Sequence, residues 1–251
     1  MWQAAIQDQI MCSIILIHRV LSAAPVLIGA NRDENKDRPA SGPETMNIGQ
    51  RTVLAPKDLE AGGTWLGTND TGLFVGITNR FAATRHPERR SRGDLPLLAL
   101  AQETPQQAIR AIKEHTPTAF NAFHLLLANA TDARIIWSDG EAFQEKELSA
   151  GLHILTESSF GAGPPERIQF IEQYISTMLS QGQINVPDMQ KLLGQKRDPS
   201  FHGLCVDVPE INYATRSATI YQESTDGSRE FHYCAVPPDQ QQWSNLSHLI
   251  P

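Results

Sequence analysis

A cysteine directly follows a methionine in the segment QDQIMCSIILIHRV, at residues 11–12. At the amino terminus of a mature chain, a cysteine carries both a thiol and an α-amine, whose pKa is about 7.7–8.0 in model peptides. That amine can take the thiol proton near neutral pH, so one residue supplies both a nucleophile and its base. This chemistry requires removal of the residues before Cys12. The alternative is that Cys12 is an ordinary buried residue at a strand start.

A second group of chemically active side chains follows in GANRDEN. Arg32 and Asp33 come directly after an apolar run at 25–30, which should pair with the run that begins at Cys12. A guanidinium near a thiol favours the thiolate, and a carboxylate can hold an ammonium or orient the arginine. The alternative is a solvated hairpin end that carries surface ion pairs.

The segment GGTWLGTNDTGLFVGITNRF, at 62–81, contributes a third group. Trp65 would supply an apolar wall, and Asn79 ends a predicted strand, where its N–H groups could face an oxyanion. The alternative is a routine hairpin in which Asn79 only starts a turn. The loop that follows is rich in arginine, and we predict that it borders a pocket mouth and favours anionic ligands. Its arginines are Arg80, Arg85, Arg89, Arg90 and Arg92.

Hydrophobic periodicity predicts the elements that must position these residues. Runs at 13–20 and 25–30 predict a buried β-hairpin, and four strands in the first eighty residues predict an antiparallel sheet. Later strands are predicted at 122–129, 133–139, 142–148, 151–157, 202–208, 213–222 and 229–236, and helices at 93–102, 104–115, 164–180 and 186–195. Blocks of strands alternating with blocks of helices favour an α+β fold, with two packed, mostly antiparallel sheets and helices outside them.

Composition restricts the class of protein. The 251 residues, 40% of them apolar, predict a single domain over 12–251, preceded by an N-terminal extension or propeptide at 1–11. A formal net charge of −7 argues against general binding to nucleic acid or anionic membranes. No apolar run approaches the ~20 residues that span a bilayer, so we expect a cytoplasmic protein without membrane insertion. Three cysteines form neither a disulfide framework nor a metal-binding pair, and we predict no metal and no cofactor.

Five segments, taken in order, resemble one known family. MCSIILI, ANRDE, GGTWLG, GLFVGITN and YATRSATI are similar to the NRDE-motif family, also called the transport and Golgi organisation type-two family. That family looks like a branch of the N-terminal-nucleophile cysteine hydrolases, which implies a layered αββα fold. Its members usually begin Met-Cys, which implies that Met11 is either the true start or the end of a short propeptide.

The resemblance also implies roles for individual residues. Cys12 matches the nucleophile, Arg32 the arginine of the hydrolase pattern, and Asn79 the oxyanion position, whereas Asp33 matches the aspartate only approximately because its spacing differs. Arg216, in YATRSAT, is similar to a late arginine that lies near the site. We therefore predict catalytic roles for Cys12, Arg32, Asp33 and Asn79, and substrate-binding roles for Asn31, Trp65, Glu157 and Arg216.

One departure from the hydrolase pattern affects the predicted chemistry. In ILTESSFGAG, Glu157 stands where the hydrolases have a second asparagine. An ionised glutamate accepts hydrogen bonds and cannot donate one to an oxyanion. The loss of one such donor typically costs about 100–1000-fold in rate.

The leading functional hypothesis is a cysteine hydrolase or acyltransferase that acts on a linear amide or a thioester. The alternative, implied by the resemblance, is a non-catalytic module for haem or acyl-lipid binding and trafficking that uses the same pocket. Either way the expected partner is a small acyl or haem-like molecule, including anionic ones. Glu157 is the feature that weakens the hydrolase hypothesis.

Overall fold

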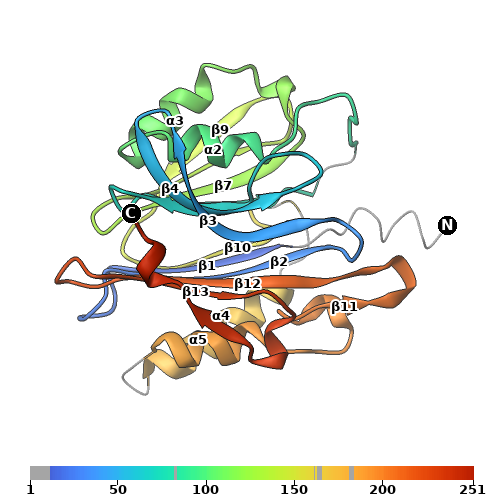
Figure 1. The fold of residues 1–251 in the computed structure, drawn as a ribbon. Coiled ribbons are helices and arrows are strands. Elements are labelled where there is room, and N and C mark those ends of the chain that lie inside the picture. The colour runs from blue at the N-terminus through green and yellow to red at the C-terminus, as the bar shows by residue number, and fades with distance from the viewer. Residues whose placement is uncertain (1–11, 82–83, 161, 163–165, 181–183) are drawn as a thin grey trace.

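The chain folds into four layers, with two facing β-sheets between two layers of helices (Figure 1). This computed structural model describes residues 12–81, 84–160, 162, 166–180 and 184–251. Helices α2 (Asp94–Leu100) and α3 (Pro105–Lys113) cover the outer face of one sheet, and α4 (Glu166–Ser180) and α5 (Val186–Leu193) cover the outer face of the other. The predicted αββα arrangement is therefore confirmed.

The first sheet contains Cys12's strand and has seven strands in the order β10-β1-β2-β12-β13-β14, with β11 also paired to β12. All of its pairings are antiparallel. Its strands are β1 (Ser13–His18), β2 (Val26–Asn35), β10 (Gly151–Leu155), β11 (Asp207–Val208), β12 (Tyr213–Glu223), β13 (Arg229–Cys234) and β14 (Trp243–Asn245).

The second sheet is an antiparallel meander in which each strand pairs with the next along the chain. Its strands are β3 (Ala40–Ile48), β4 (Arg51–Asp58), β5 (Leu66–Asn69), β6 (Phe74–Asn79), β7 (Phe123–Ala128), β8 (Ala133–Ser138) and β9 (Phe143–Glu147). Short connections are sufficient for such a sheet, since antiparallel neighbours need only a hairpin turn.

Four helices complete the outer layers: α2 (Asp94–Leu100), α3 (Pro105–Lys113), α4 (Glu166–Ser180) and α5 (Val186–Leu193). Helix α3 begins as its sequence predicts, because the Thr104 side chain accepts a hydrogen bond from the Gln107 N–H at 3.2 Å and Pro105 occupies the first turn. Short 3₁₀ turns lie at Pro117–Ala119, Ser200–His202, Pro209–Ile211, Pro238–Gln240 and Ser247–Leu249. No described helix is long and apolar enough to cross a lipid bilayer.

Strand β1 explains why the sequence after Cys12 is continuously apolar. Ile14 and Leu16 face the core between the two sheets, whereas Ile15 and Ile17 face the core under α4 and α5. A strand covered on both faces has no solvent side, so it lacks the usual alternation of apolar and polar residues. Cys12 is therefore attached to one of the most deeply buried strands.

Two sequence predictions differ from the structure. The first eighty residues form six strands rather than four, and β1–β2 and β3–β6 belong to different sheets. Strand β3 escaped prediction because it is an edge strand with mostly exposed side chains and two turn-forming residues, Gly42 and Pro43. The segment 202–208 forms a strand only at Asp207–Val208, because side chains rather than a neighbouring strand bond the Leu204 carbonyl.

Candidate active site

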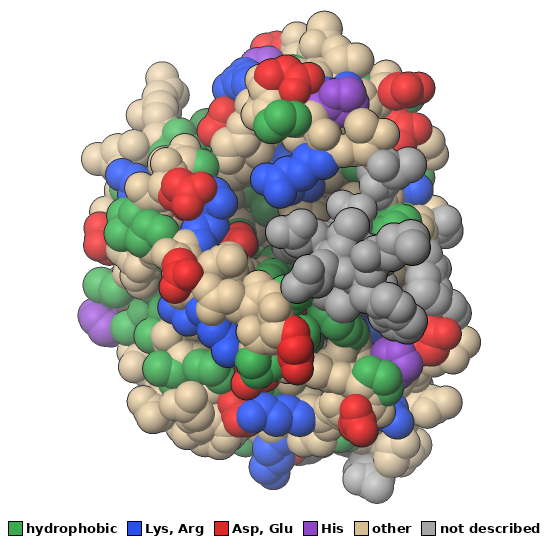
Figure 2. Space-filling model, turned by 90° about the vertical axis from the view of Figure 1, so that its right-hand side faces the viewer, with side chains coloured by type: hydrophobic (Ala, Val, Ile, Leu, Met, Phe, Trp, Pro, Cys, Tyr) green, Lys and Arg blue, Asp and Glu red, His purple; other side chains and the backbone are tan. Residues whose placement is uncertain are grey.

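A cleft of about 760 Å³ is lined by residues from both sheets and from the loop after β6. On the face shown in Figure 2, basic and acidic side chains both lie around the hollow. The cleft lies at the ends of β2 and β6, the two strands that carry Arg32, Asp33 and Asn79. Its size falls in the range of about 300–1,000 Å³ that is usual for small-molecule sites.

Cys12 lies at the entrance to β1 and lines this cleft. Its thiol donates a long hydrogen bond to the backbone carbonyl of Asp33, with Sγ and O 3.6 Å apart. Burial raises the pKa of the thiol to about 12, and the charge of Asp33 adds to the rise. The thiol is therefore protonated at neutral pH, and it needs a nearby base to become a nucleophile.

Asp33 is fully buried and is held by two donors. Its Oδ2 accepts a hydrogen bond from Arg167 Nη2 at 3.0 Å, and its Oδ1 accepts one from Thr215 Oγ1 at 2.5 Å. Burial raises the pKa of Asp33 to about 6, because desolvation outweighs the opposing effects of Arg167 and Thr215. The carboxyl group can thus change protonation state just below neutral pH.

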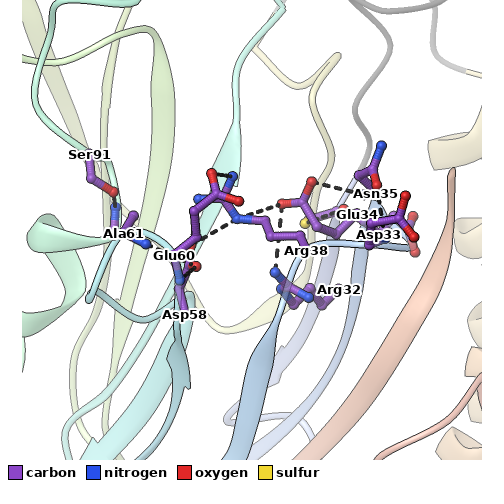
Figure 3. Close-up of polar contacts among 12 residues, drawn as sticks. Arg32, Asp33, Glu34, Asn35, Arg38, Asp58, Glu60, Ala61 and Ser91 are labelled. Carbon is purple, nitrogen blue, oxygen red and sulfur yellow. Dashed lines mark hydrogen bonds and ion pairs between the residues drawn. The ribbon is translucent and has the colours of Figure 1, made fainter. Parts of the chain in front are cut away.

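Arg32 belongs to a row of alternating charges along one wall (Figure 3). Its guanidinium lies over the Trp65 ring, 4.4 Å from the centroid, and 3.7 Å from Glu34. Figure 3 also shows Arg38 between Glu34 and an acidic pair; Arg38 is 2.7 Å from the Asp58 carboxylate and 3.1 Å from that of Glu60. Stacking on Trp65 therefore fixes the orientation of the Arg32 guanidinium, and the ion pairs fix that of the Arg38 guanidinium.

Asn79 and Glu157 supply two further polar groups to the cleft. Asn79 ends β6, and no described residue bonds its side-chain amide, which leaves its N–H groups available as donors. Glu157 follows β10 and is only 6% exposed. Its Oε1 accepts a hydrogen bond from Ser158 Oγ at 2.6 Å, whereas its buried Oε2 has no partner among the described residues.

Two of the eight predicted residues lie outside the cleft lining. The Asn31 amide is buried and donates to the carbonyls of Leu193 and Leu204 at 3.0 and 2.9 Å. Arg216 is the extra residue of a β-bulge in the pairing of β12 with β2, and it lines a separate pocket of about 170 Å³ next to Cys205. A bulge commonly turns a side chain away from the regular sheet direction. The other six residues line the cleft together: Cys12, Arg32, Asp33, Trp65, Asn79 and Glu157.

Sequence reasoning missed the partners of Asp33. Arg167 lies in the first turn of α4, four and eight residues before Ile171 and Ile175, so it shares their buried face. A charged residue on a helix's apolar face was the available signal, since a buried charge needs a partner. Thr215 had no such local signal. Across the described residues, no group of three or more His, Cys, Asp and Glu side chains is arranged to hold a metal ion.

Two antiparallel sheets enclosed by two layers of helices form the layered arrangement of the N-terminal-nucleophile hydrolase fold. The chain is similar to an N-acylethanolamine-hydrolyzing acid amidase ortholog of Caenorhabditis elegans, with a TM-score of 0.52 and 15% identity, covering 83% of this chain and 92% of that one. It is also similar to a variant of conjugated bile acid hydrolase from Clostridium perfringens, with a TM-score of 0.52, 11% identity and coverage of 94% and 92%. At such identities the likeness concerns the fold.

The chain belongs to the Transport and Golgi organisation 2 family, whose model matches residues 11–233. It is 26% identical to the mouse Transport and Golgi organization 2 homolog over 116 residues. That match covers 45% of this chain and 42% of the mouse protein, so it spans less than half of that relative. The predicted family membership is confirmed.

Proposed function

We propose that this protein is a cysteine hydrolase or acyltransferase that acts on a linear amide or thioester after residues 1–11 have been removed. The observation that carries the proposal is the meeting of Cys12, Arg32, Asp33 and Asn79 in one cleft of a hydrolase-type fold. Residues 1–11, including Met11, lie outside the described residues. Their removal would leave 12–251 as the single working domain and convert the Cys12 nitrogen from an amide into an amine.

The free amine supplies the base that the buried Cys12 thiol requires. In the uncut chain the pKa of the thiol is about 12, and a peptide nitrogen has no basicity. Once Cys12 is terminal, its amine takes the thiol proton, and the thiolate sulfur attacks the substrate carbonyl. The resulting ammonium then gives its proton to the leaving amine or thiol as the bond to the carbonyl carbon breaks. Water or a second acceptor, deprotonated by the same amine, attacks the acyl-Cys12 thioester and restores the thiol.

Neighbouring residues would support each charge that develops. Asn79 would donate to the oxyanion, since its amide has no partner among the described residues. Ionised Asp33 would stabilise the ammonium of Cys12, and Arg167 and Thr215 would hold that carboxylate in place. Arg32, stacked on Trp65, would favour the thiolate.

Glu157 bears on the choice between amide and thioester. With an ionised Glu157 the cleft lacks one oxyanion donor of the hydrolase pattern, which lowers rates by about 100–1000-fold. A thioester tolerates this loss better than an amide, because a thiol with a pKa of about 8.5 leaves more easily than an amine. We therefore expect thioesters to be cleaved faster than matched amides.

The test compares three chains with an electrophilic acyl probe near neutral pH: one that begins at Cys12, one that retains residues 1–11, and Cys12→Ala that also begins at residue 12. Intact mass establishes each amino terminus. We expect labelling of the trimmed chain to be at least about 100-fold faster, since each unit of pKa changes the thiolate fraction about tenfold. Equal rates in the trimmed and extended chains would refute the N-terminal-nucleophile mechanism.

A second candidate is a non-catalytic module that binds haem or an acyl lipid in the same cleft. The Oε2 of Glu157, which has no partner among the described residues, favours it, because a buried acceptor on a residue that lines the cleft suits ligand binding better than oxyanion stabilisation. A haem absorbance shift on mixing, without covalent capture of the acyl probe at Cys12, would support this candidate. Capture without the shift would support the hydrolase.

A further inference from the structure

Seven arginines line the cleft, and the structure sorts them by how their charge is neutralised. Arg38 contacts Asp58 and Glu60, and Arg90 lies 3.0 Å from Asp94. Arg32 lies beside Glu34 and against Trp65. These three cations already have carboxylate partners, so they have little remaining attraction for a ligand's negative charge.

Two other arginines, Arg80 and Arg89, donate hydrogen bonds to backbone carbonyls and so hold the loop after β6 against its neighbours. Arg89 donates to the Phe120 and Gly140 carbonyls, both at 3.1 Å. Arg80 donates to the Ser159 carbonyl at 2.8 Å and lies 3.0 Å from His124 Nε2. Such bonds from a single side chain to several backbone oxygens hold adjacent segments together and direct these two guanidinium groups toward the backbone.

Arg92 and Arg85 remain, and among the described residues neither has a carboxylate partner. Arg92 donates one hydrogen bond, to the Ala122 carbonyl at 3.0 Å, although a guanidinium has five N–H groups. Burial lowers the pKa of Arg92 to about 10, and the positive charge of Arg85 lowers it further. Arg92 and Cys12 line the same cleft, so a ligand bound beside the thiol has access to this guanidinium.

We propose that Arg92, assisted by Arg85 at the cleft's rim, forms a subsite for a carboxylate group on the ligand. This inference rests on the proposed function in that it takes the cleft beside Cys12 as the ligand site. A carboxylate would accept paired hydrogen bonds from the unoccupied N–H groups of Arg92, in the bidentate geometry that guanidinium favours. It would also relieve the repulsion between two neighbouring cations that have no carboxylate partner within the described ranges.

The test uses two small thiol reagents that differ chiefly in charge, iodoacetate and iodoacetamide. Each forms a carbon–sulfur bond with the Cys12 thiolate as its carbon–iodine bond breaks and iodide leaves. Both reagents report on the same thiolate, so the ratio of their rate constants cancels the thiol pKa and leaves the preference for a carboxylate. Peptide mass spectrometry of the full chain measures labelling at Cys12 separately from that at Cys205 and Cys234.

Arg92→Gln should lower the iodoacetate-to-iodoacetamide ratio by about 3- to 10-fold, the size expected for losing one partly desolvated charge. Arg92→Lys should retain part of the preference for iodoacetate, since lysine keeps the positive charge but cannot donate two parallel hydrogen bonds to a carboxylate. The matched control is Arg110→Gln, which removes a positive charge from an exposed position of α3 outside the cleft lining and should leave the ratio unchanged.

Arg85→Gln provides a second variant at an exposed position, in case Arg92→Gln disturbs folding through its bond to Ala122. It should lower the ratio about two- to threefold, and added salt should reduce this effect. An unchanged ratio in Arg85→Gln and in folded Arg92→Gln would overturn the subsite, as would an equal fall in the Arg110→Gln control. Because alkylation needs no turnover, failure of the subsite is distinguishable from failure of the acyl-transfer function.

Discussion

The floor of the cleft and its rim both contain desolvated ionisable groups, but they treat charge differently. On the floor, formed by Cys12, Asp33 and Glu157, burial raises the pKa of the Cys12 thiol and of Asp33, which favours their neutral forms. On the rim, formed by Arg85 and Arg92, burial lowers the pKa of Arg92 to about 10, which still leaves it charged at neutral pH. Asp33 on the floor can therefore change its protonation state just below neutral pH, whereas Arg92 on the rim keeps its charge.

This difference suits the floor to the chemical step and the rim to ligand binding. On the floor, Asp33 is held by short hydrogen bonds from Arg167 and Thr215, and Glu157 by one from Ser158. The rim residues have few such bonds, so their charge acts outward on a ligand. A buried ion pair is costly to break because one partner is left uncompensated, while an exposed charge is readily hydrated when its partner is removed. The predictions below test this contrast.

The largest expected effect concerns stability. Arg167→Gln should lower the free energy of unfolding at about pH 8 by about 3–5 kcal/mol, because it removes the guanidinium that offsets the desolvation of the ionised Asp33 carboxylate. Arg85→Gln, at an exposed position, should change it by no more than about 0.5 kcal/mol. Denaturant unfolding measures both. The double variant Asp33→Asn/Arg167→Gln should recover part of the loss, and similar losses at floor and rim would contradict the comparison.

The next effect is a pH dependence set by Asp33. Its folded pKa of about 6 exceeds the model value of 3.8, so the folded state binds this proton more tightly than the unfolded state does. The group's stabilising contribution is therefore complete below about pH 3.8 and is lost as the pH rises through about 6. Acylation should show the opposite trend, falling about tenfold per pH unit well below pH 6, because protonated Asp33 no longer stabilises the Cys12 ammonium.

Rates of acylation from pH 4.5 to 8 on the trimmed chain, together with unfolding measurements over the same range, test both trends. Asp33→Asn should remove the acidic limb of the rate profile and flatten this part of the stability profile. A limb that persists near pH 6 in Asp33→Asn would assign the titration to another group.

Glu157→Asn should have the third-largest effect. A neutral amide can donate to an oxyanion where a carboxylate repels it, so hydrolysis of an activated thioester by the trimmed chain should rise by about 10-fold or more. Glu157→Gln is the matched control, since it also removes the charge but extends one methylene further. A fall in both hydrolysis and ligand binding in Glu157→Asn would show instead that the carboxylate itself serves the ligand.

The smallest effect is expected at Arg90, a cleft arginine whose charge is already paired with a carboxylate. Arg90→Gln should change the iodoacetate-to-iodoacetamide ratio at Cys12 by less than about twofold, because Asp94 already pairs with this cation and such exposed pairs contribute little. The change in the same ratio in Arg92→Gln is the value with which the change in Arg90→Gln is compared. A larger change in Arg90→Gln than in Arg92→Gln would mean that pairing does not decide which arginines face the ligand.

The sequence predicted the αββα fold, the family and a group of candidate residues, six of which line one cleft. It succeeded where the information is local, as at the Thr104 cap of α3 or in the apolar run of β1. It failed for β3, since an exposed edge strand has little hydrophobic pattern, and for 202–208, where side chains replace strand pairing.

By itself the sequence determined that Cys12 begins a buried strand and that Arg32 and Asp33 follow on the strand beside it, because periodicity and adjacency suffice to pair a hairpin. Only the tertiary structure decided which distant charges meet. The packing of α4 against the first sheet brings Arg167 to Asp33, and the pairing of β12 with β2 brings Thr215 to it. The bulge between Thr215 and Ser217 directs Arg216 to another pocket, and Arg92 bonds the Ala122 carbonyl with no carboxylate partner in the part of the chain that the structure describes. Contacts between residues more than a hundred positions apart depend on how whole elements pack, and no local pattern encodes them.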